Sequence, residues 1–268
     1  MKIKLADIEL NCHDEGRGEP LVLLHGFPLD HRMWSHQIRE FGKTHRVLAP
    51  DLRGFGKSDA PPDDLTTVTM TQLADDLDAL LDALAIDSPI ILCGLSMGGY
   101  VCWEMFSRHR DRLGRLVLCD TRAGKDSPEV AKGREIMAHR LESEGTEFFL
   151  ESMPAKLFAP ETIRRGTNAY QSTCQSIRDS SPRGAAAAAR GMALRRDFSS
   201  QLAEIDLPTL VVCGQYDAIS TPDEMCSMAS EIPGARFCEI PDAGHMAPLE
   251  NPEPFNQVLG EFLNESLQ

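Results

Sequence analysis

The sequence predicts an α/β fold in which a mostly parallel sheet is covered by helices on both faces. Short apolar runs alternate with segments whose apolar residues recur every three or four positions, which is the pattern of parallel strands joined by helices. The 268 residues are 42% hydrophobic and 25% charged, an ordinary globular composition with enough length for a substantial core. The predicted strands are Leu21–His25, Arg46–Ala49, Ile90–Cys93, Leu116–Cys119, Leu210–Cys213 and Arg236–Ile240.

Helices are predicted between and after these strands. One helix should run from Met97 to about His109, and the last from about Glu253 to Leu263. The first residues, Lys2–Asn11, alternate polar and apolar side chains and should form an antiparallel lead-in. Another amphipathic helix is indicated by a leucine stripe of helical period, made by Leu73, Leu77, Leu80, Leu81 and Leu84.

The strand and helix alternation stops between residues 121 and 200. This segment has no convincing strand, and Glu129–Leu141 and Gly184–Leu194 have helical character. The second of these contains five consecutive alanines, and alanine is the best helix former. We therefore predict a core domain of residues 1–120 and 201–268, with residues 121–200 inserted as a helical cap.

A candidate nucleophile lies in Gly94-Leu95-Ser96-Met97-Gly98, which has the pattern G-x-S-x-G directly after a predicted strand and before a predicted helix. In that context the serine occupies a strained turn and its hydroxyl stands at the amino end of the helix, where developing negative charge is favoured. A chance glycine-serine turn is the alternative. The flanking strand and helix favour Ser96 as a nucleophile.

A serine nucleophile needs a base, and His245 is the best candidate among eight histidines. It lies in a loop between the last predicted strand and the last predicted helix, and such a loop opens onto the same edge of the sheet as Ser96. His25 also ends a strand, but its place before Gly26-Phe27-Pro28 suggests a structural role in the loop. The other six lie in polar or surface-like stretches.

The base in turn needs a buried carboxylate that fixes its tautomer. Asp217 follows a predicted strand and lies between Ser96 and His245 in the chain, which gives the order Ser, Asp, His. Asp120 ends another predicted strand and is its competitor. Asp242 and Asp223 are interpreted as turn and helix-start residues.

Two main-chain amides are predicted to form an oxyanion hole, which stabilises the charge of a tetrahedral intermediate. One is the N–H of Met97, directly after the nucleophile. The other is the N–H of Phe27, because Gly26 allows an unusual backbone conformation before it.

The net charge and the lack of long apolar runs limit the kinds of partner that the protein can bind. The formal net charge of −14 and a pI near 5.0 argue against a nucleic-acid or anionic-membrane surface, so we expect a small-molecule partner. No stretch approaches the ~18 apolar residues of a membrane span, and the amino-terminal residues lack the apolar run of a signal peptide. We therefore expect a cytoplasmic protein, and the sequence leaves its oligomeric state open.

No cofactor and no metal are predicted. His and Cys residues show no metal-ligand spacing, and no G-x-G-x-x-G follows a strand. The glycine-punctuated segment of residues 51–58 lacks the spacing of a phosphate loop and is interpreted as a structural turn. Cysteines beside apolar runs are interpreted as core residues in a reducing compartment; they are Cys93, Cys119, Cys213 and Cys238.

Five segments together resemble the α/β-hydrolase superfamily over nearly the whole chain. They are HGFPLD from His25, DLRGFGKS from Asp51, GLSMGG from Gly94, GQYDAISTP from Gly214 and GHMAPLENPE from Gly244. Within the superfamily, these segments and Asp120-Thr121-Arg122-Ala123 are most similar to those of carboxylesterases and 3-oxoadipate enol-lactonases. The resemblance implies the α/β-hydrolase fold with eight strands and a helical cap. It also implies cofactor-free hydrolysis by a triad matching Ser96, His245 and Asp217.

The expected activity is therefore hydrolysis of small carboxylic esters or lactones through an acyl-enzyme on Ser96. Two alternatives stay open: the same triad could hydrolyse carbon–carbon bonds or perform perhydrolysis, and the fold could serve as a small-molecule sensor with little turnover. An aspartate-nucleophile mechanism is disfavoured because the elbow carries serine.

Substrate preference should depend on side chains near the cap. An enol-lactone carries a carboxylate, so its enzyme should place a cation in the pocket, and four arginines are available: Arg122, Arg183, Arg190 and Arg195. Aromatic residues that could line the pocket are Phe27, Trp34, Phe148, Phe149 and Phe158.

Overall fold

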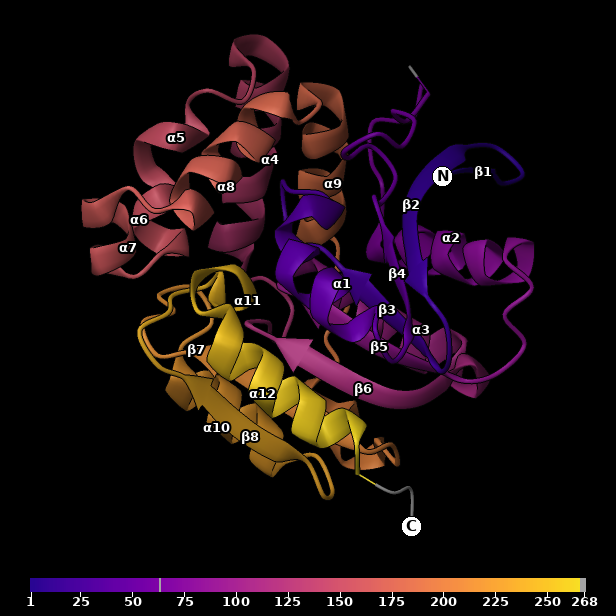
Figure 1. Ribbon diagram of the computed structural model, residues 1–268. Helices are drawn as coiled ribbons and strands as arrows, with labels where there is room; N and C mark the ends of the chain where they lie inside the picture. The colour runs from indigo at the N-terminus through magenta and orange to yellow at the C-terminus, as the bar shows by residue number, and fades with distance from the viewer. Residues whose placement is uncertain (63, 266–268) are drawn as a thin grey trace.

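The computed structural model describes residues 1–62 and 64–265. Its strands are β1 (Lys2–Lys4), β2 (Glu9–Gly16), β3 (Pro20–Leu24), β4 (Arg46–Pro50), β5 (Ile90–Leu95), β6 (Leu113–Cys119), β7 (Thr209–Gly214) and β8 (Arg236–Ile240). Within the described residues they form one eight-stranded sheet in the order β1-β2-β4-β3-β5-β6-β7-β8 (Figure 1). β1 with β2 and β2 with β4 pair antiparallel, and the remaining pairs are parallel. The predicted mostly parallel sheet is confirmed.

Differences between the predicted and observed strands lie at their ends. β6 begins at Leu113, three residues before the predicted start, and pairs with β5 across an irregularity at Ile90 and Ile91. The predicted lead-in is two strands, since a turn closed by the Leu5 amide and the Ile8 carbonyl separates β1 from β2. The central strands β3 and β5 are buried along their whole length, as apolar runs between two helical layers should be.

Helices cover both faces of the sheet. In Figure 1, α1 and α12 lie in front of the sheet and α2 and α3 behind it. The predicted leucine stripe buries four of its five residues in α2, whereas Leu84 caps the helix end and is only half-buried. The core helices are α1 (Ser35–Phe41), α2 (Met70–Ala83), α3 (Met97–Arg108), α10 (Pro222–Ser230), α11 (Ala247–Glu250) and α12 (Pro252–Leu263), with 3₁₀ turns at His31–Trp34, Arg110–Arg112 and Ser199–Glu204.

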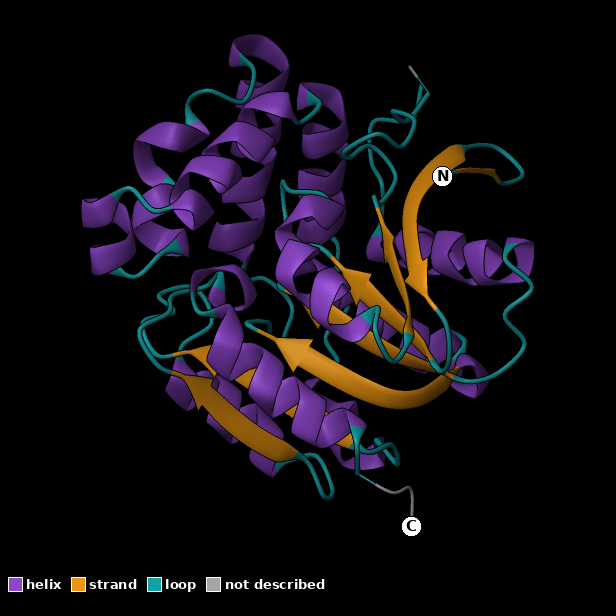
Figure 2. Ribbon diagram, viewed as in Figure 1, coloured by secondary structure: helices purple, strands orange, loops and turns teal. Residues whose placement is uncertain are grey.

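A separate group of helices follows β6 and lies over one end of the sheet. Figure 2 shows this group as helices joined by loops, beyond the carboxyl ends of the central strands. Its members are α4 (Pro128–Glu144), α5 (Phe149–Ser152), α6 (Pro154–Leu157), α7 (Pro160–Arg165), α8 (Asn168–Asp179) and α9 (Pro182–Ala193). We call residues 128–193 the cap. The sequence predicted only α4 and α9. The helical period is unreadable in helices as short as α5, α6 and α7, whereas α8 has twelve residues and was missed.

The alanine run lies in α9 and serves close packing. Ala185, Ala186, Ala187, Ala188 and Ala189 are all buried. A Cβ atom on Gly184 would stand 1.9 Å from the carbonyl oxygen of Gly54, and one on Gly191 would stand 1.7 Å from that of Val68. Small side chains therefore let this helix touch the backbone of the core loops.

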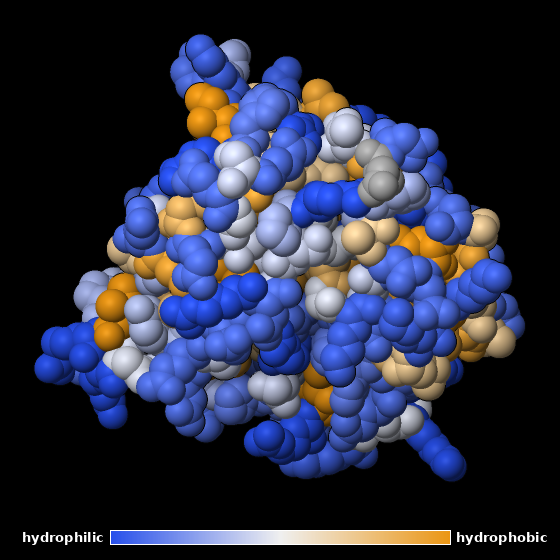
Figure 3. Space-filling view, turned by 90° about the horizontal axis from the view of Figure 1, so that it is seen from above, coloured by the Kyte–Doolittle hydropathy of each residue, from blue (hydrophilic) through white to orange (hydrophobic). Residues whose placement is uncertain are grey.

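Seen from above, the face that carries the cap is mostly hydrophilic with small, scattered hydrophobic groups (Figure 3). Among the described residues, no helix is long and apolar enough to cross a membrane.

Cys93, Cys119 and Cys213 are buried as predicted, but Cys238 is half-buried because β8 is the edge strand.

Candidate active site

The three residues predicted for catalysis lie at one edge of the sheet. Ser96 follows β5, Asp217 comes three residues after β7, and His245 lies in the loop after β8. These strands are parallel, so their carboxyl ends meet at the same edge. Asp217 and His245, which lie 121 and 149 residues after Ser96 in the chain, are thereby brought to the same edge of the sheet as Ser96.

Ser96 occupies a strained turn between β5 and α3. Its φ of 54° and ψ of −111° lie outside the regions that L-residues favour, and such a conformation costs about 1–3 kcal/mol. The amide of Ser96 donates to the carbonyl of Cys119 at 3.0 Å, and its carbonyl accepts from the Thr121 hydroxyl at 2.8 Å. Bonds to Cys119 at the end of β6 and from Thr121 just after it therefore hold a conformation that the local chain disfavours.

The glycines around Ser96 allow the turn to pack. A Cβ on Gly94 would stand 2.4 Å from the carbonyl oxygen of Gly98, and a Cβ on Gly98 would stand 2.4 Å from that of Leu24. Real side chains do not make such contacts. The G-x-S-x-G spacing thus places α3 directly against β3 and β5, with Ser96 at its amino end.

His245 and Asp217 form a buried pair. The Nδ1 atom of His245 lies 2.7 Å from Oδ2 of Asp217, and both residues are at most 3% exposed. The other oxygen of Asp217 accepts from the amides of Ile219 at 2.7 Å and Ser220 at 3.1 Å. These bonds fix the carboxylate, which orients the imidazole so that Nε2 is the free ring nitrogen.

Ser96 and His245 line the same cavity. Among the described residues the Ser96 hydroxyl makes no hydrogen bond, and such contacts are often loose in structures without substrate. The cavity has a volume of about 360 Å³ and lies between the cap and the sheet edge. Its lining residues are Phe27, Ser96, Tyr100, Val130, Gly133, Arg134, Met137, Met153, Lys156, Leu157, Met192, Ile219 and His245.

The two predicted oxyanion amides are free in this structure. Within the part of the chain that the structure describes, neither the N–H of Phe27 nor that of Met97 donates a hydrogen bond. His25 fixes the loop that carries Phe27: its Nδ1 lies 3.0 Å from the carbonyl of Gly26, and its Nε2 accepts from the amide of Leu52 at 3.0 Å. Burial lowers the pKa of His25, which suits a neutral ring in the structural role that the sequence suggested.

Asp120, the competing carboxylate, lies beside Asp217 rather than bonded to the histidine. Its Oδ1 accepts from the amide of Gly214 at 2.8 Å, and its Oδ2 is buried without a partner among the described residues. Asp242 lies in a turn at a φ of 55°, and Asp223 lies in the first turn of α10, which Thr221 caps. The geometry favours Asp217 as the partner of His245.

The cations of the cavity are not the four arginines that the sequence suggested. Each of those is engaged elsewhere: Arg122 with Glu224, Arg183 with the carbonyl of Pro61, Arg190 with Glu142, and Arg195 with Asp126. Instead, Arg134 and Lys156 line the cavity. Arg134 pairs with Asp126, whereas the exposed Lys156 ammonium has no partner within the described residues. Both residues come from cap helices, and the spacing of residues along the sequence does not reveal how these helices are oriented.

The aromatic residues suggested for the pocket are mostly core. Phe27 lines the cavity and packs edge-on against Phe149, with ring centroids 5.8 Å apart. Trp34 is fully buried against Phe255, and Phe158 packs on Tyr170. Three methionines, Met137, Met153 and Met192, also line the cavity, and a flexible thioether side chain adapts to substrates of different shape.

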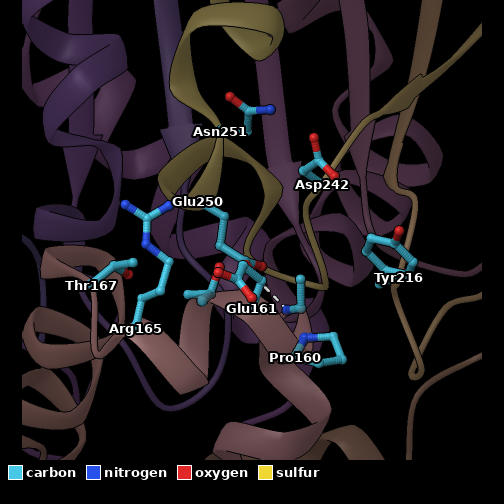
Figure 4. Close-up of a pocket in the computed structure, with 10 residues that line it drawn as sticks. Pro160, Glu161, Arg165, Thr167, Tyr216, Asp242, Glu250 and Asn251 are labelled. Carbon is cyan, nitrogen blue, oxygen red and sulfur yellow. Dashed lines mark hydrogen bonds between the residues drawn. The ribbon is translucent and has the colours of Figure 1, made fainter.

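Glu250 ties the histidine loop to the cap. One carboxylate oxygen accepts from the amide of Gly244 at 2.6 Å, and the other accepts from the amide of Ala159 at 3.0 Å. Figure 4 shows the second bond at the wall of another cavity, of about 690 Å³, which shares no lining residue with the one holding Ser96. The amide of Met246 also donates to the carbonyl of Leu157 at 3.1 Å. Two hydrogen bonds thus connect the segment around His245 with the cap, and the bond from Gly244 to Glu250 fixes the loop to the residue that reaches the cap.

The segment of residues 51–58 acts as a structural turn, as its sequence indicated. Asp51 is buried and accepts from Nδ1 and the amide of His31 and from the amide of Lys57. Although burial alone raises the pKa of Asp51, the His31 bonds hold this pKa well below its usual range. Arg53 is buried between Asp7 and Asp76. Protein donors therefore occupy the carboxylates that could otherwise hold a ligand.

Comparison with known proteins shows the family to which this chain belongs. A family model described as alpha/beta hydrolase fold matches residues 19–252. A 3-oxoadipate enol-lactonase of Acinetobacter baylyi is 29% identical over 243 residues, covering 91% of this chain and 88% of the relative. A thermophilic esterase of Thermogutta terrifontis, solved with malate bound, is 45% identical with a TM-score of 0.94, and the match covers 98% of this chain and 97% of that one. An enol-lactonase of Burkholderia xenovorans is 30% identical with a TM-score of 0.88, covering 99% and 100%. The chain belongs to the α/β-hydrolase fold family.

Proposed function

We propose that the protein hydrolyses small carboxylic esters or lactones through an acyl-enzyme on Ser96. His245 takes the hydroxyl proton as Ser96 attacks the carbonyl carbon, and the amides of Phe27 and Met97 donate hydrogen bonds to the oxyanion that forms. The tetrahedral intermediate expels the alkoxide, which leaves with the proton from His245. Water activated by the same histidine then releases the acid and restores Ser96.

One observation carries this proposal. The strained Ser96 faces a cavity that His245 also lines, and His245 is bonded through Nδ1 to a buried carboxylate. A serine held in an unfavourable turn beside an oriented imidazole is the arrangement that nucleophilic acyl transfer needs. The esterase and enol-lactonase relatives support the same class of substrate.

The test is steady-state hydrolysis of a panel of p-nitrophenyl esters and simple lactones by the wild type and Ser96→Ala. We expect multiple turnover that falls by at least about 10³-fold in Ser96→Ala, because the covalent route is lost. The ranking of the panel distinguishes an esterase from a lactonase. Binding without turnover would overturn the proposal and favour a sensor. Cleavage of a carbon–carbon bond or formation of a peracid, without hydrolysis of esters or lactones, would overturn it in favour of the other triad chemistries.

We further propose that the preferred substrates carry a negative charge away from the scissile bond. Among the described residues that line the cavity, Lys156 and Arg134 are cationic and none is acidic, although the chain has a net charge of −14. Lys156 is the free cation of the two, so it is available to an anionic substrate.

A charge-matched pair of esters tests this preference. For Lys156→Met we expect KM to rise about tenfold for a half-ester of a dicarboxylic acid, the equivalent of about 1.4 kcal/mol, and to change less than twofold for the neutral ester of the same length. Lys132→Met is the control, since Lys132 is an exposed α4 lysine outside the cavity lining. Equal effects on both esters, or equal effects of both variants, would contradict the preference.

A further inference from the structure

Asp120 is a buried acid that the proposed mechanism does not use. It is fully buried, at a φ of 45°, and stands directly after β6. One oxygen accepts from the amide of Gly214 at 2.8 Å, whereas Oδ2 has no partner among the described residues. A bare carboxylate oxygen in a dry site costs several kcal/mol. The structure must therefore supply a proton or a cation there.

Its neighbour is the carboxylate that orients the histidine. One side-chain ligand atom from each of Asp120, Asp217 and Cys213 lies within 4.8 Å of the other two. All three residues are buried. Two carboxylates at this distance, shielded from water, cannot both be ionised without a compensating charge. The pair therefore holds one proton.

The hydrogen bonds decide which acid carries the proton. Asp217 accepts from two amides and from Nδ1 of His245, and three donors strongly stabilise an ionised carboxylate. Within the described part of the chain, Asp120 accepts from one amide, that of Gly214. We propose that Asp120 is a neutral carboxylic acid at neutral pH and points its Oδ2–H at Asp217, so that a single negative charge faces His245.

The other titratable groups around Asp120 agree with this assignment. Burial and the charge of Asp217 raise the pKa of Asp120 well above its usual range, and the charge of Glu250 acts in the same direction. Burial raises the pKa of the neighbouring thiols of Cys119 and Cys213, which stay neutral. Apart from His245 on the far side of Asp217, none of these groups supplies a positive charge.

In this role Asp120 is a positioning residue. Its proton donates a fourth hydrogen bond to Asp217, while its Oδ1 anchors Gly214 at the end of β7. Asparagine reproduces the protonated acid, because its carbonyl accepts from Gly214, its amide donates to Asp217, and it tolerates a positive φ. Glycine also tolerates this φ but supplies neither group.

The pH profile of kcat/KM for Asp120→Asn separates a neutral from an ionised Asp120. We expect kcat/KM within about threefold of wild type and the midpoint of the acidic limb within about 0.3 pH units, whereas Asp120→Gly should lose tenfold or more. If Asp120 were ionised, Asp120→Asn would remove a negative charge beside the His245 pair and lower that midpoint by on the order of one pH unit. Asp242→Asn, at an exposed turn on the histidine loop, controls for a general change in charge.

A second measurement needs neither a variant nor activity. The side-chain carboxyl ¹³C resonance of Asp120 in the wild type, assigned through its own backbone, should have the chemical shift of a protonated acid at pH 7. The shift of an ionised carboxylate would overturn the proposal. So would a stoichiometric metal ion in the purified protein whose removal by a chelator changes this resonance, since a cation would then replace the proton.

Discussion

Replacing Glu250 with alanine removes the carboxylate that bonds the histidine loop to the cap. Its two oxygens accept from the amides of Gly244 at 2.6 Å and Ala159 at 3.0 Å, and both donors are buried. An unsatisfied buried amide costs about 1–3 kcal/mol. Burial raises the pKa of Glu250, so removing this acid also relieves an unfavourable burial. We expect a net loss of about 2–4 kcal/mol in the free energy of unfolding.

The same variant should slow catalysis, because Gly244 directly precedes His245. A displacement near 1 Å at a catalytic group can reduce the rate about 100-fold, and we expect kcat to fall at least tenfold with a smaller change in KM.

Urea unfolding at pH 7 and steady-state ester hydrolysis measure the two effects. Glu250→Gln, which retains one acceptor, should lie between alanine and wild type. Glu161→Ala is the control. Glu161 lines the cavity of about 690 Å³ that Glu250 also lines, but it is exposed and, among the described residues, pairs with Arg164 alone, so this variant should change stability by less than about 0.5 kcal/mol. A Glu250→Ala protein with wild-type stability and kcat would refute this reasoning.

Three further predictions concern the triad acid, the nucleophile turn and a buried loop carboxylate. Asp217→Asn should lower kcat by about 10³–10⁴-fold in ester hydrolysis, because asparagine stabilises the wrong tautomer of His245; a loss below tenfold would contradict the role of Asp217. Gly98→Ala should destabilise by more than about 2 kcal/mol in urea unfolding because its Cβ has no room, whereas Gly133→Ala, which meets nothing within 4 Å, should be neutral or more stable by up to about 1 kcal/mol; equal effects would refute the packing argument. The pKa of Asp51 is lowered in the folded state, so its stabilisation is present above its unfolded pKa, near 3.8, and is lost as pH falls below it. Asp51→Asn should therefore cost about 2–3 kcal/mol at pH 7 and progressively less below pH ~4, and a pH-independent difference would contradict this sign.

The sequence could predict the sheet and the positions of the triad candidates because these depend on local signals. Apolar runs identified β3 to β8, and G-x-S-x-G between a strand and a helix placed Ser96 at the strained turn that the structure shows at a φ of 54°. Topology then determines which strand ends meet, so His245 and Asp217 could be chosen by their place after strands. Their 2.7 Å bond follows from that arrangement.

The cap and the substrate cations could not be predicted in the same way. α5, α6 and α7 span four to six residues each, which is too short for a helical period. Which cap side chains face the cavity depends on how the helices pack, and the small residues of α9 set that packing by touching core backbone. Lys156 and Arg134 therefore carried no sequence signal. Glu250 also passed unnoticed, because its partners are backbone amides far apart in the chain.

The central claim is that Ser96 is the nucleophile of an acyl-transfer mechanism. The most direct test is incubation with an alkyl fluorophosphonate followed by peptide mass analysis, with Ser96→Ala and His245→Ala as comparisons. We predict a single phosphonyl adduct on the peptide that contains Ser96, formed much more slowly in His245→Ala, and absent in Ser96→Ala. A protein that hydrolyses esters while its label lies on another residue, or remains labelled in Ser96→Ala, would contradict the account.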